Sequence, residues 1–206
     1  MQSALPKQMI QVHGKEILIH TIEKFVRFDT SIEIILVIHE SLKDPCTALL
    51  KKYNLDTQTV MVAGGPTRFH SVRNGLDAIP DTHAVVGIHD AARPLVSVEA
   101  IERCYKTAQI MGNAIPVVNV NESLREVNGA SNHAVSRDRY RIVQTPQCFE
   151  LERIRAAFTQ PYSDAFTDDA TVLESTGEHI HLVEGNVENI KITHPVDLQI
   201  AALFLA

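Results

Sequence analysis

One apolar run narrows the fold classes that suit this chain. Residues 84–88 read Ala-Val-Val-Gly-Ile and are followed by His89-Asp90-Ala-Ala-Arg93-Pro. An apolar run without polar alternation is typical of a strand covered on both faces, as in parallel α/β sheets. Ligands of such sheets bind in the crevice outside the carboxyl ends of the strands. We therefore expect Asp90 and Arg93 where a substrate would dock. An ion pair that merely closes the strand is the structural alternative.

Helical and strand patterns alternate along most of the 206 residues. The spacing of apolar residues predicts helices over 16–28, 45–53, 67–78, 97–111, 150–158, 168–175 and 196–205, and strands over 32–38, 58–62, 84–88, 113–118 and 180–183. This order indicates parallel strands joined by right-handed helical crossovers. Because the chain contains no internal repeat and no linker, we expect a single domain over residues 1–206.

The alternation breaks between residues 119 and 141. Residues 122–127 alternate weakly, Asn128-Gly129 is a strong turn signal, and residues 133–136 suit a return strand. Such a hairpin cannot bury a core by itself. We therefore predict an arm at about 119–141 that packs on a partner subunit. A hairpin laid on its own domain is the alternative.

Composition and charge exclude several classes of function. A net charge of -6 argues against nonspecific nucleic-acid binding, which needs a basic face. The longest apolar runs are too short to span a bilayer, and the N-terminal residues do not have the pattern of a signal peptide. Cys46, Cys104 and Cys148 are odd in number and lack metal-ligand spacing, so we expect reduced thiols. A cytoplasmic protein is expected.

Five clusters of polar residues fall at predicted loops and strand ends. In one of them, Gly64-Gly65 ends a strand, and Thr67 would cap a helix whose first turn carries Arg68 and Ser71. Exposed amides at a helix start suit a nucleotide base or a phosphate, although a plain strand-turn-helix remains the alternative. The other clusters are Leu5-Pro6-Lys7-Gln8, residues 90–94, Ser136-Arg137-Asp138 with Thr145-Pro146-Gln147, and Thr167-Asp168-Asp169 with residues 183–193.

These clusters share the chemistry of phosphate binding. They contain three separated cations, namely Lys7, Arg93 or Arg137, and Lys191, together with an acid near a strand end and a glycine turn. No serine, cysteine or histidine stands out as a covalent nucleophile. Enzymes of phosphoryl and nucleotidyl transfer mainly position the reactants and neutralise developing charge. The residues favour that class. For Lys191, predicted in a short strand between two isoleucines, a structural salt bridge is the alternative.

Six motifs occur in order along the chain: P-K-Q, G-G-x-x-R-x-x-S-V, H-D-A-A-R-P, T-P-Q, T-D-D-A and V-E-G-x-x-x-N-I-K-I-T. Together they resemble the 2-C-methyl-D-erythritol 4-phosphate cytidylyltransferases of non-mevalonate isoprenoid biosynthesis, over essentially the whole chain. The resemblance implies an α/β, Rossmann-like nucleotidyltransferase three-layer sandwich with a protruding β-hairpin arm, and a homodimer formed through the arms. It also implies Mg²⁺-dependent attack of the substrate phosphate on the α-phosphate of CTP, yielding 4-diphosphocytidyl-2-C-methyl-D-erythritol and pyrophosphate.

The resemblance also assigns roles to residues. Lys7, Lys191 and Arg137 are the implied catalytic residues, the two lysines at the α-phosphate, and Arg137 with Lys191 at the substrate phosphate. The implied nucleotide-binding residues are Gly64, Gly65, Arg68, Ser71 and Lys7. The implied substrate-binding residues are Asp90, Arg93, Ser123, Arg137, Thr145, Thr167 and Lys191. Among them, Ser123 and Arg137 would reach the partner's site. No residue is assigned to a metal.

The sequence departs from the family pattern at its start. The family opens with a strand and a glycine-rich loop that wraps the triphosphate and ends in arginine-methionine, and Met1 corresponds to that methionine. Without the strand and the loop we expect lower stability and poor catalysis. Ser123 stands where many relatives carry threonine, which keeps a hydroxyl.

Two other functions stay open at this point. A ribitol 5-phosphate cytidylyltransferase shares most motifs, but its relatives tend to carry valine as the second small residue before the arginine. Ala92 therefore favours the methylerythritol phosphate. A catalytically impaired nucleotide-binding module is the other alternative, motivated by the missing loop.

Overall fold

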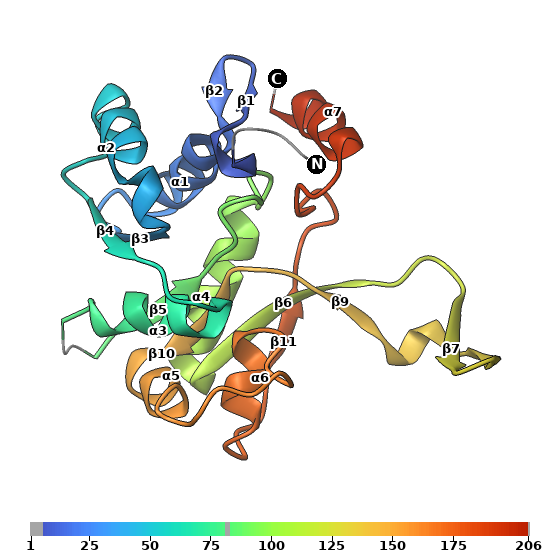
Figure 1. The fold of residues 1–206 in the computed structure, drawn as a ribbon. Helices are drawn as coiled ribbons and strands as arrows, with labels where there is room; N and C mark the ends of the chain where they lie inside the picture. The colour runs from blue at the N-terminus through green and yellow to red at the C-terminus, as the bar shows by residue number, and fades with distance from the viewer. Residues whose placement is uncertain (1–5, 81–82, 206) are drawn as a thin grey trace.

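The computed structural model describes residues 6–80 and 83–205, and a five-stranded sheet lies near its centre (Figure 1). In spatial order the strands are β11 (Leu182–Glu184), β6 (Asn113–Asn119), β10 (Gln147–Glu150) and β5 (Val85–Ile88), and β9 (Arg141–Val143) also pairs with β6. A separate parallel pair is formed by β3 (Ile34–Ile38) and β4 (Thr59–Ala63). The predicted strands are present with ends shifted by a few residues, except for the strand expected around Lys191, which the structure does not contain.

The expectation of parallel strands throughout is wrong for the centre of the sheet. β10 runs antiparallel to both of its neighbours, with Cys148 opposite Gly87 on one side and Ala114 on the other. β11 and β6 are parallel, as are β3 and β4. The sequence pattern missed β10 because its four residues are too few to show a period, and it leads directly into a helix.

Every predicted helix is confirmed. The helices are α1 (Ile17–Phe28), α2 (Lys43–Lys52), α3 (Arg68–Asp77), α4 (Val98–Met111), α5 (Leu151–Ala157), α6 (Asp169–Glu174) and α7 (Pro195–Phe204). Side chains cap several N-termini, since Thr67, Ser97 and Asp168 each accept a hydrogen bond from the backbone three residues on. Gly112 ends α4 with φ of 89°, a left-handed conformation that glycine adopts without strain.

The helices cover both faces of the sheet, which confirms the three-layer α/β sandwich. On one face, residues of α3, α5 and α6 pack against Ile115 and Phe149 of the sheet in the largest apolar cluster. On the other face, Cys104 and Ala108 of α4 pack against Ala114 and the adjoining strands. α1 lies against α4 on this second face.

A large apolar cavity lies between β3 and β5. Among the described residues, β3 pairs only with β4, and β5 pairs only with β10. The two open strand edges face a space of about 950 Å³ that α1 and α3 also line. The cavity continues past the carboxyl end of β5 to Arg68, Ser71 and Asp90. It therefore reaches the strand ends where the sequence places the candidate site.

The predicted arm is a hairpin of β7 (Leu124–Asn128) and β8 (Ser131–Val135), in which Asn128 lies opposite Ser131. Gly129 takes φ of 59° in the turn. Figure 1 shows the hairpin and η3 (Arg137–Arg139) projecting away from the layered body. Nearly all of its side chains are exposed, so the arm buries no core of its own.

Short elements complete the fold. Before α1 come η1 (Lys7–Met9), β1 (Gln11–Val12) and β2 (Lys15–Glu16), and η2 (Glu40–Leu42) precedes α2. The sequence pattern did not predict the β1–β2 hairpin. Over residues 6–80 and 83–205, none of the helices combines the length and apolar character needed to cross a bilayer.

Candidate functional site

The turn formed by residues 90–93 directly follows β5 and carries an acid and a base that meet. The backbone N–H of Arg93 donates to the carbonyl of Asp90 at 3.0 Å, and the Arg93 Nε donates to Asp90 Oδ2, also at 3.0 Å. Lys191 brings a second cation, with its Nζ 3.1 Å from the same Oδ2. The fold thus joins three of the predicted residues from segments about a hundred residues apart in sequence.

Charge keeps the Asp90 carboxylate ionised. Burial opposes ionisation, since only 16% of the side chain is exposed, but Lys191 and Arg93 outweigh it and lower the pKa of Asp90. The side chain of Lys191 is 46% exposed, whereas that of Arg93 is only 13% exposed. The cluster therefore presents a half-exposed cation beside a mostly buried acid and a mostly buried guanidinium.

Lys191 is not in a strand, which corrects the prediction for this segment. It lies in an irregular segment, and its neighbours Ile190 and Ile192 pack in an apolar cluster. The backbone N–H of Ile192 donates to the carbonyl of Ala92 at 2.9 Å. The packed isoleucines and this hydrogen bond fix the backbone of Lys191 beside the 90–93 turn.

The glycine turn lies on the other side of the same cavity. The N–H of Gly65 donates to Ser71 Oγ at 3.0 Å, and that hydroxyl donates to the carbonyl of Thr67 at 3.0 Å. A Cβ on Gly65 would lie 2.5 Å from the Cβ of His70, so only glycine fits there. Ser71 therefore shapes the turn as well as lining the cavity.

Arg68 pairs with a residue whose role the sequence pattern did not reveal. Its guanidinium donates to both carboxylate oxygens of Asp169, at 2.8 Å for Nη1. Asp169 is fully buried, and burial raises the pKa of its carboxyl while Arg68 opposes that rise. The pair ties the start of α3 to the start of α6. A T-D-D motif alone could not show which carboxylate points inward.

Thr145 and Thr167 lie near the two clusters in different ways. Thr145 is buried, and its Oγ1 accepts the N–H of Asp90 at 3.1 Å. Thr167 is exposed and immediately precedes Asp168, the N-cap of α6. The hydroxyl of Thr145 therefore holds the 90–93 turn, whereas Thr167 is open to solvent.

Three predicted residues are not brought to the Asp90 cluster within this chain. Ser123 and Arg137 lie at the exposed ends of the arm, where the Arg137 guanidinium donates to the carbonyl of Asn121. Lys7 begins η1, which packs against α1, and its ammonium forms no ion pair with a described residue. Met1 and Leu5 lie outside the described residues.

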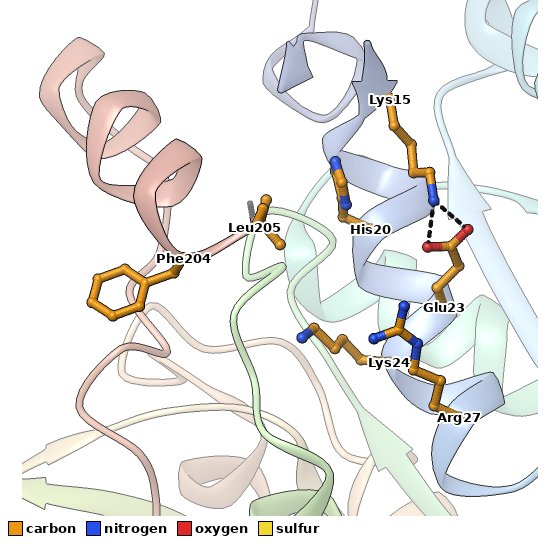
Figure 2. Close-up of a pocket in the computed structure, with 7 residues that line it drawn as sticks. All are labelled: Lys15, His20, Glu23, Lys24, Arg27, Phe204 and Leu205. Carbon is orange, nitrogen blue, oxygen red and sulfur yellow. Dashed lines mark hydrogen bonds and ion pairs between the residues drawn. The ribbon is translucent and has the colours of Figure 1, made fainter. Parts of the chain in front are cut away.

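A second, smaller cavity of about 220 Å³ lies between α1 and the end of α7. Figure 2 shows Lys15, Glu23 and Lys24 among its lining side chains, with Lys15 Nζ 2.7 Å from Glu23 Oε1. Burial and the nearby charge of Arg27 lower the pKa of Lys24. None of the predicted site residues lines this cavity, so the candidate site stays at the strand ends.

Comparisons with known proteins identify the family of this chain. The family model "IspD: 2-C-methyl-D-erythritol 4-phosphate cytidylyltransferase" matches residues 1–206. The cytidylyltransferase of that name from Bacteroides thetaiotaomicron is 45% identical over 205 residues, covering 100% of this chain and 93% of the relative. The one from Porphyromonas gingivalis is 42% identical, covering 97% of this chain and 89% of the relative.

Solved structures give the same result for the fold. The crystal structure of 2-C-methyl-D-erythritol 4-phosphate cytidylyltransferase from Thermus thermophilus matches with a TM-score of 0.81 and 32% identity, covering 98% of this chain and 95% of that one. A 4-diphosphocytidyl-2C-methyl-D-erythritol synthase from Anaerococcus prevotii matches with a TM-score of 0.86 and 28% identity, covering 98% and 91%. The Rossmann-like nucleotidyltransferase fold is thereby confirmed. The chain belongs to the 2-C-methyl-D-erythritol 4-phosphate cytidylyltransferase family.

Proposed function

We propose that this chain transfers the cytidylyl group of CTP to 2-C-methyl-D-erythritol 4-phosphate, forming 4-diphosphocytidyl-2-C-methyl-D-erythritol and pyrophosphate. The observation that carries the proposal is the meeting of Asp90, Arg93 and Lys191 on one carboxylate oxygen, in a chain of this family. The cluster lies beside the cavity that also reaches Ser71 of the glycine turn. One site for a phosphate and one for a nucleotide are thus adjacent.

The reaction needs positioning and charge neutralisation more than covalent catalysis. An oxygen of the substrate phosphate attacks the α-phosphorus of CTP. The bond from that phosphorus to the oxygen shared with the β-phosphate breaks, and its electron pair leaves with pyrophosphate. Lys191 is exposed enough to turn from Asp90 toward the phosphates and to stabilise the charge on the α-phosphate. Arg93 stays fixed by Asp90 and by the carbonyl of Asn189, 2.8 Å from its Nη1.

The glycine turn and α3 suit the nucleotide. Gly65 lets the turn pass close to His70, where an added Cβ would lie 2.5 Å from the His70 Cβ, and α3 begins directly after this turn. The N-terminus of a helix favours negatively charged groups such as phosphate. The fully buried carboxylate of Asp169 holds Arg68 at the start of α3. Lys7 would join this site when CTP is bound, by its resemblance to the family's P-K-Q lysine.

When bound with CTP, Mg²⁺ would supply positive charge that offsets the charge of the triphosphate. Proteins bind Mg²⁺ through one or two carboxylates together with phosphate oxygens. Asp90 fits this role, because both cations lie on its Oδ2 and no described residue donates a hydrogen bond to its Oδ1. The carboxylate can therefore keep its cations and still offer one oxygen to an ion.

We also propose that the chain acts in the cytoplasm as a homodimer, and the exposed apolar residues of the arm and of β9 support the dimer. Val127 is 71% exposed and Ile142 is 48% exposed, and apolar side chains of this kind gain free energy when a partner covers them. An arm that reaches across to a second subunit would also bring its Ser123 and Arg137 to the substrate phosphate of that subunit.

The direct test measures pyrophosphate release from CTP and Mg²⁺ with 2-C-methyl-D-erythritol 4-phosphate. Ribitol 5-phosphate is the matched control substrate, since it is also a polyol phosphate. We expect release with the first substrate and little with the second. Absence of release with the methylerythritol phosphate would refute the proposal, and faster release with ribitol 5-phosphate would reassign the substrate.

A further inference from the structure

His89 uses both ring nitrogens to hold the turn that carries Asp90 and Arg93. Its Nδ1 lies 3.0 Å from Thr145 Oγ1, and its Nε2 lies 3.2 Å from the carbonyl oxygen of Arg93. The ring packs edge-on against Phe25 of α1, with the ring centroids 4.9 Å apart. A histidine that ends a strand and bonds at both nitrogens is fixed in place and is not a free proton carrier.

The partners favour one of the two neutral forms of the ring. A carbonyl oxygen accepts and never donates, so the His89 Nε2 must carry the hydrogen that faces Arg93. Thr145 Oγ1 already accepts the N–H of Asp90 at 3.1 Å, and its own hydrogen is then directed at Nδ1. The neutral ring with its hydrogen on Nε2 therefore satisfies every partner.

The same network fixes both ends of the 90–93 turn. Thr145 holds the amide of Asp90, and His89 holds the carbonyl of Arg93. Between them, Thr21 of α1 donates to the carbonyl of Ala91 at 3.0 Å, and the backbone of Ile192 donates to that of Ala92 at 2.9 Å. Every residue of the turn is anchored from outside it.

We propose that His89 is a positioning residue for the polyol phosphate: it holds the 90–93 turn so that Asp90 and Arg93 stay in register with Lys191. This role rests on the proposed function, and His89 itself touches no substrate. A histidine that only fills space against Phe25 would tolerate a ring of similar size. A positioning histidine would not tolerate that replacement, because its hydrogen bonds to Thr145 and to the Arg93 carbonyl hold the turn in place.

The environment keeps His89 neutral at physiological pH. The charged groups next to the ring are Asp90 and Arg93, and the contacts from other elements, Phe25 and Thr145, are uncharged. Burial lowers the pKa of His89 from 6.5 to about 4, against a smaller opposing effect of the Arg93 carbonyl.

The kinetic test compares His89→Phe, which keeps the ring size, with His89→Gln, whose amide can still donate to the Arg93 carbonyl. We expect His89→Phe to lower kcat/KM for the methylerythritol phosphate by about tenfold or more, because small misplacements at a reacting site are costly. The loss should fall on the KM for the polyol phosphate and leave the KM for CTP nearly unchanged. His89→Gln should recover part of the loss.

A measurement without substrates separates this inference from the proposed function. Nitrogen-15 NMR of the wild-type ring at pH 7 should show the neutral form with hydrogen on Nε2, and Thr145→Val should shift the Nδ1 signal. A protonated ring, hydrogen on Nδ1, or an Nδ1 signal insensitive to Thr145→Val would overturn the inference. So would a folded His89→Phe protein with wild-type kinetics. If the wild-type chain makes no product, the proposed function fails and the NMR result alone decides on the network.

Discussion

Among single residues, Lys191 combines a backbone held by its packed neighbours with a charged side chain that is half exposed. Its Nζ lies 3.1 Å from Asp90, yet nearly half of its side chain is exposed. An ion pair this open contributes at most about 1 kcal/mol to folding. Replacing Lys191 should therefore change the free energy of unfolding only slightly. Its position beside the 90–93 turn points to a role in the reaction.

Replacing Lys191 by alanine should abolish pyrophosphate release while the protein stays folded. Loss of one charge that stabilises a transition state costs about a hundredfold or more in kcat. Lys43→Ala is the matched control, because Lys43 also pairs with an acid, Glu40, but both side chains are exposed at the start of α2 and line neither cavity. Steady-state rates and urea unfolding curves check both. Full activity in Lys191→Ala would remove this lysine from the mechanism.

The pKa of Asp90 offers a second test of the contact between Lys191 and Asp90. The lowered pKa means that ionised Asp90 stabilises the fold above its unfolded pKa near 3.8, and that this contribution is lost as pH falls through the lower folded value. Lys191→Met removes the largest of the favourable charges, so the pKa of Asp90 should rise in that variant. Carbon-13 NMR of the carboxyl group measures it. An unchanged or lower pKa in Lys191→Met would show that Lys191 does not act on Asp90.

At the scale of elements, the Arg68–Asp169 pair joins α3 to α6. The two partners are unequal, since 42% of the Arg68 side chain is exposed and none of Asp169. Arg68 can turn to water when its partner is lost, but a stranded Asp169 carboxylate cannot. Loss of the arginine should therefore lower the free energy of unfolding more than loss of the acid does.

Arg68→Ala should thus destabilise the protein more than Asp169→Asn does. Leaving a buried charge unpaired costs about 3–5 kcal/mol, and we expect about 3 kcal/mol for Arg68→Ala because its site borders solvent. Arg153→Ala, which breaks an exposed pair with Glu150, is the control and should change little. Urea unfolding measures all three variants. A larger loss for Asp169→Asn would contradict this account of the pair.

Elements with a clear period or cap could be predicted from sequence, whereas the sheet order could not. The caps of Thr67 and Ser97 and the turn at Asn128-Gly129 are local signals, and the structure confirms them. β10 and the antiparallel centre of the sheet depend on tertiary pairing, which no local pattern records. The strand expected around Lys191 failed for the same reason, because its isoleucines pack without a strand partner.

The candidate site could also be predicted only in part from the sequence. Asp90, Arg93 and Lys191 carry motif signals, and the fold does bring them together. His89 and Asp169 gave no separate signal, because their importance lies in which partners they face. A sequence motif identifies residue types at a strand end, but the direction of a buried side chain follows only from packing.

At the scale of the whole molecule, the arm leaves the single chain with an incomplete set of the expected residues. Ser123 and Arg137 lie on the exposed arm, away from the cluster at Asp90. In a two-fold symmetric dimer each arm would meet the other subunit in the same way, because both copies use the same surface. Each site would then combine Lys191 of one subunit with the arm of the other.

Mixing two inactive variants tests this arrangement. Lys191→Ala and Arg137→Ala should each be inactive alone, whereas a mixed dimer contains one site in which both residues are intact. Random reassortment makes about half of the dimers mixed, so the mixture should regain about one quarter of wild-type activity. Refolding the variants together and measuring pyrophosphate release gives the result, with sedimentation velocity to confirm the dimers. If the mixture is no more active than the separate variants while mixed dimers form, Arg137 acts on its own subunit or not at all.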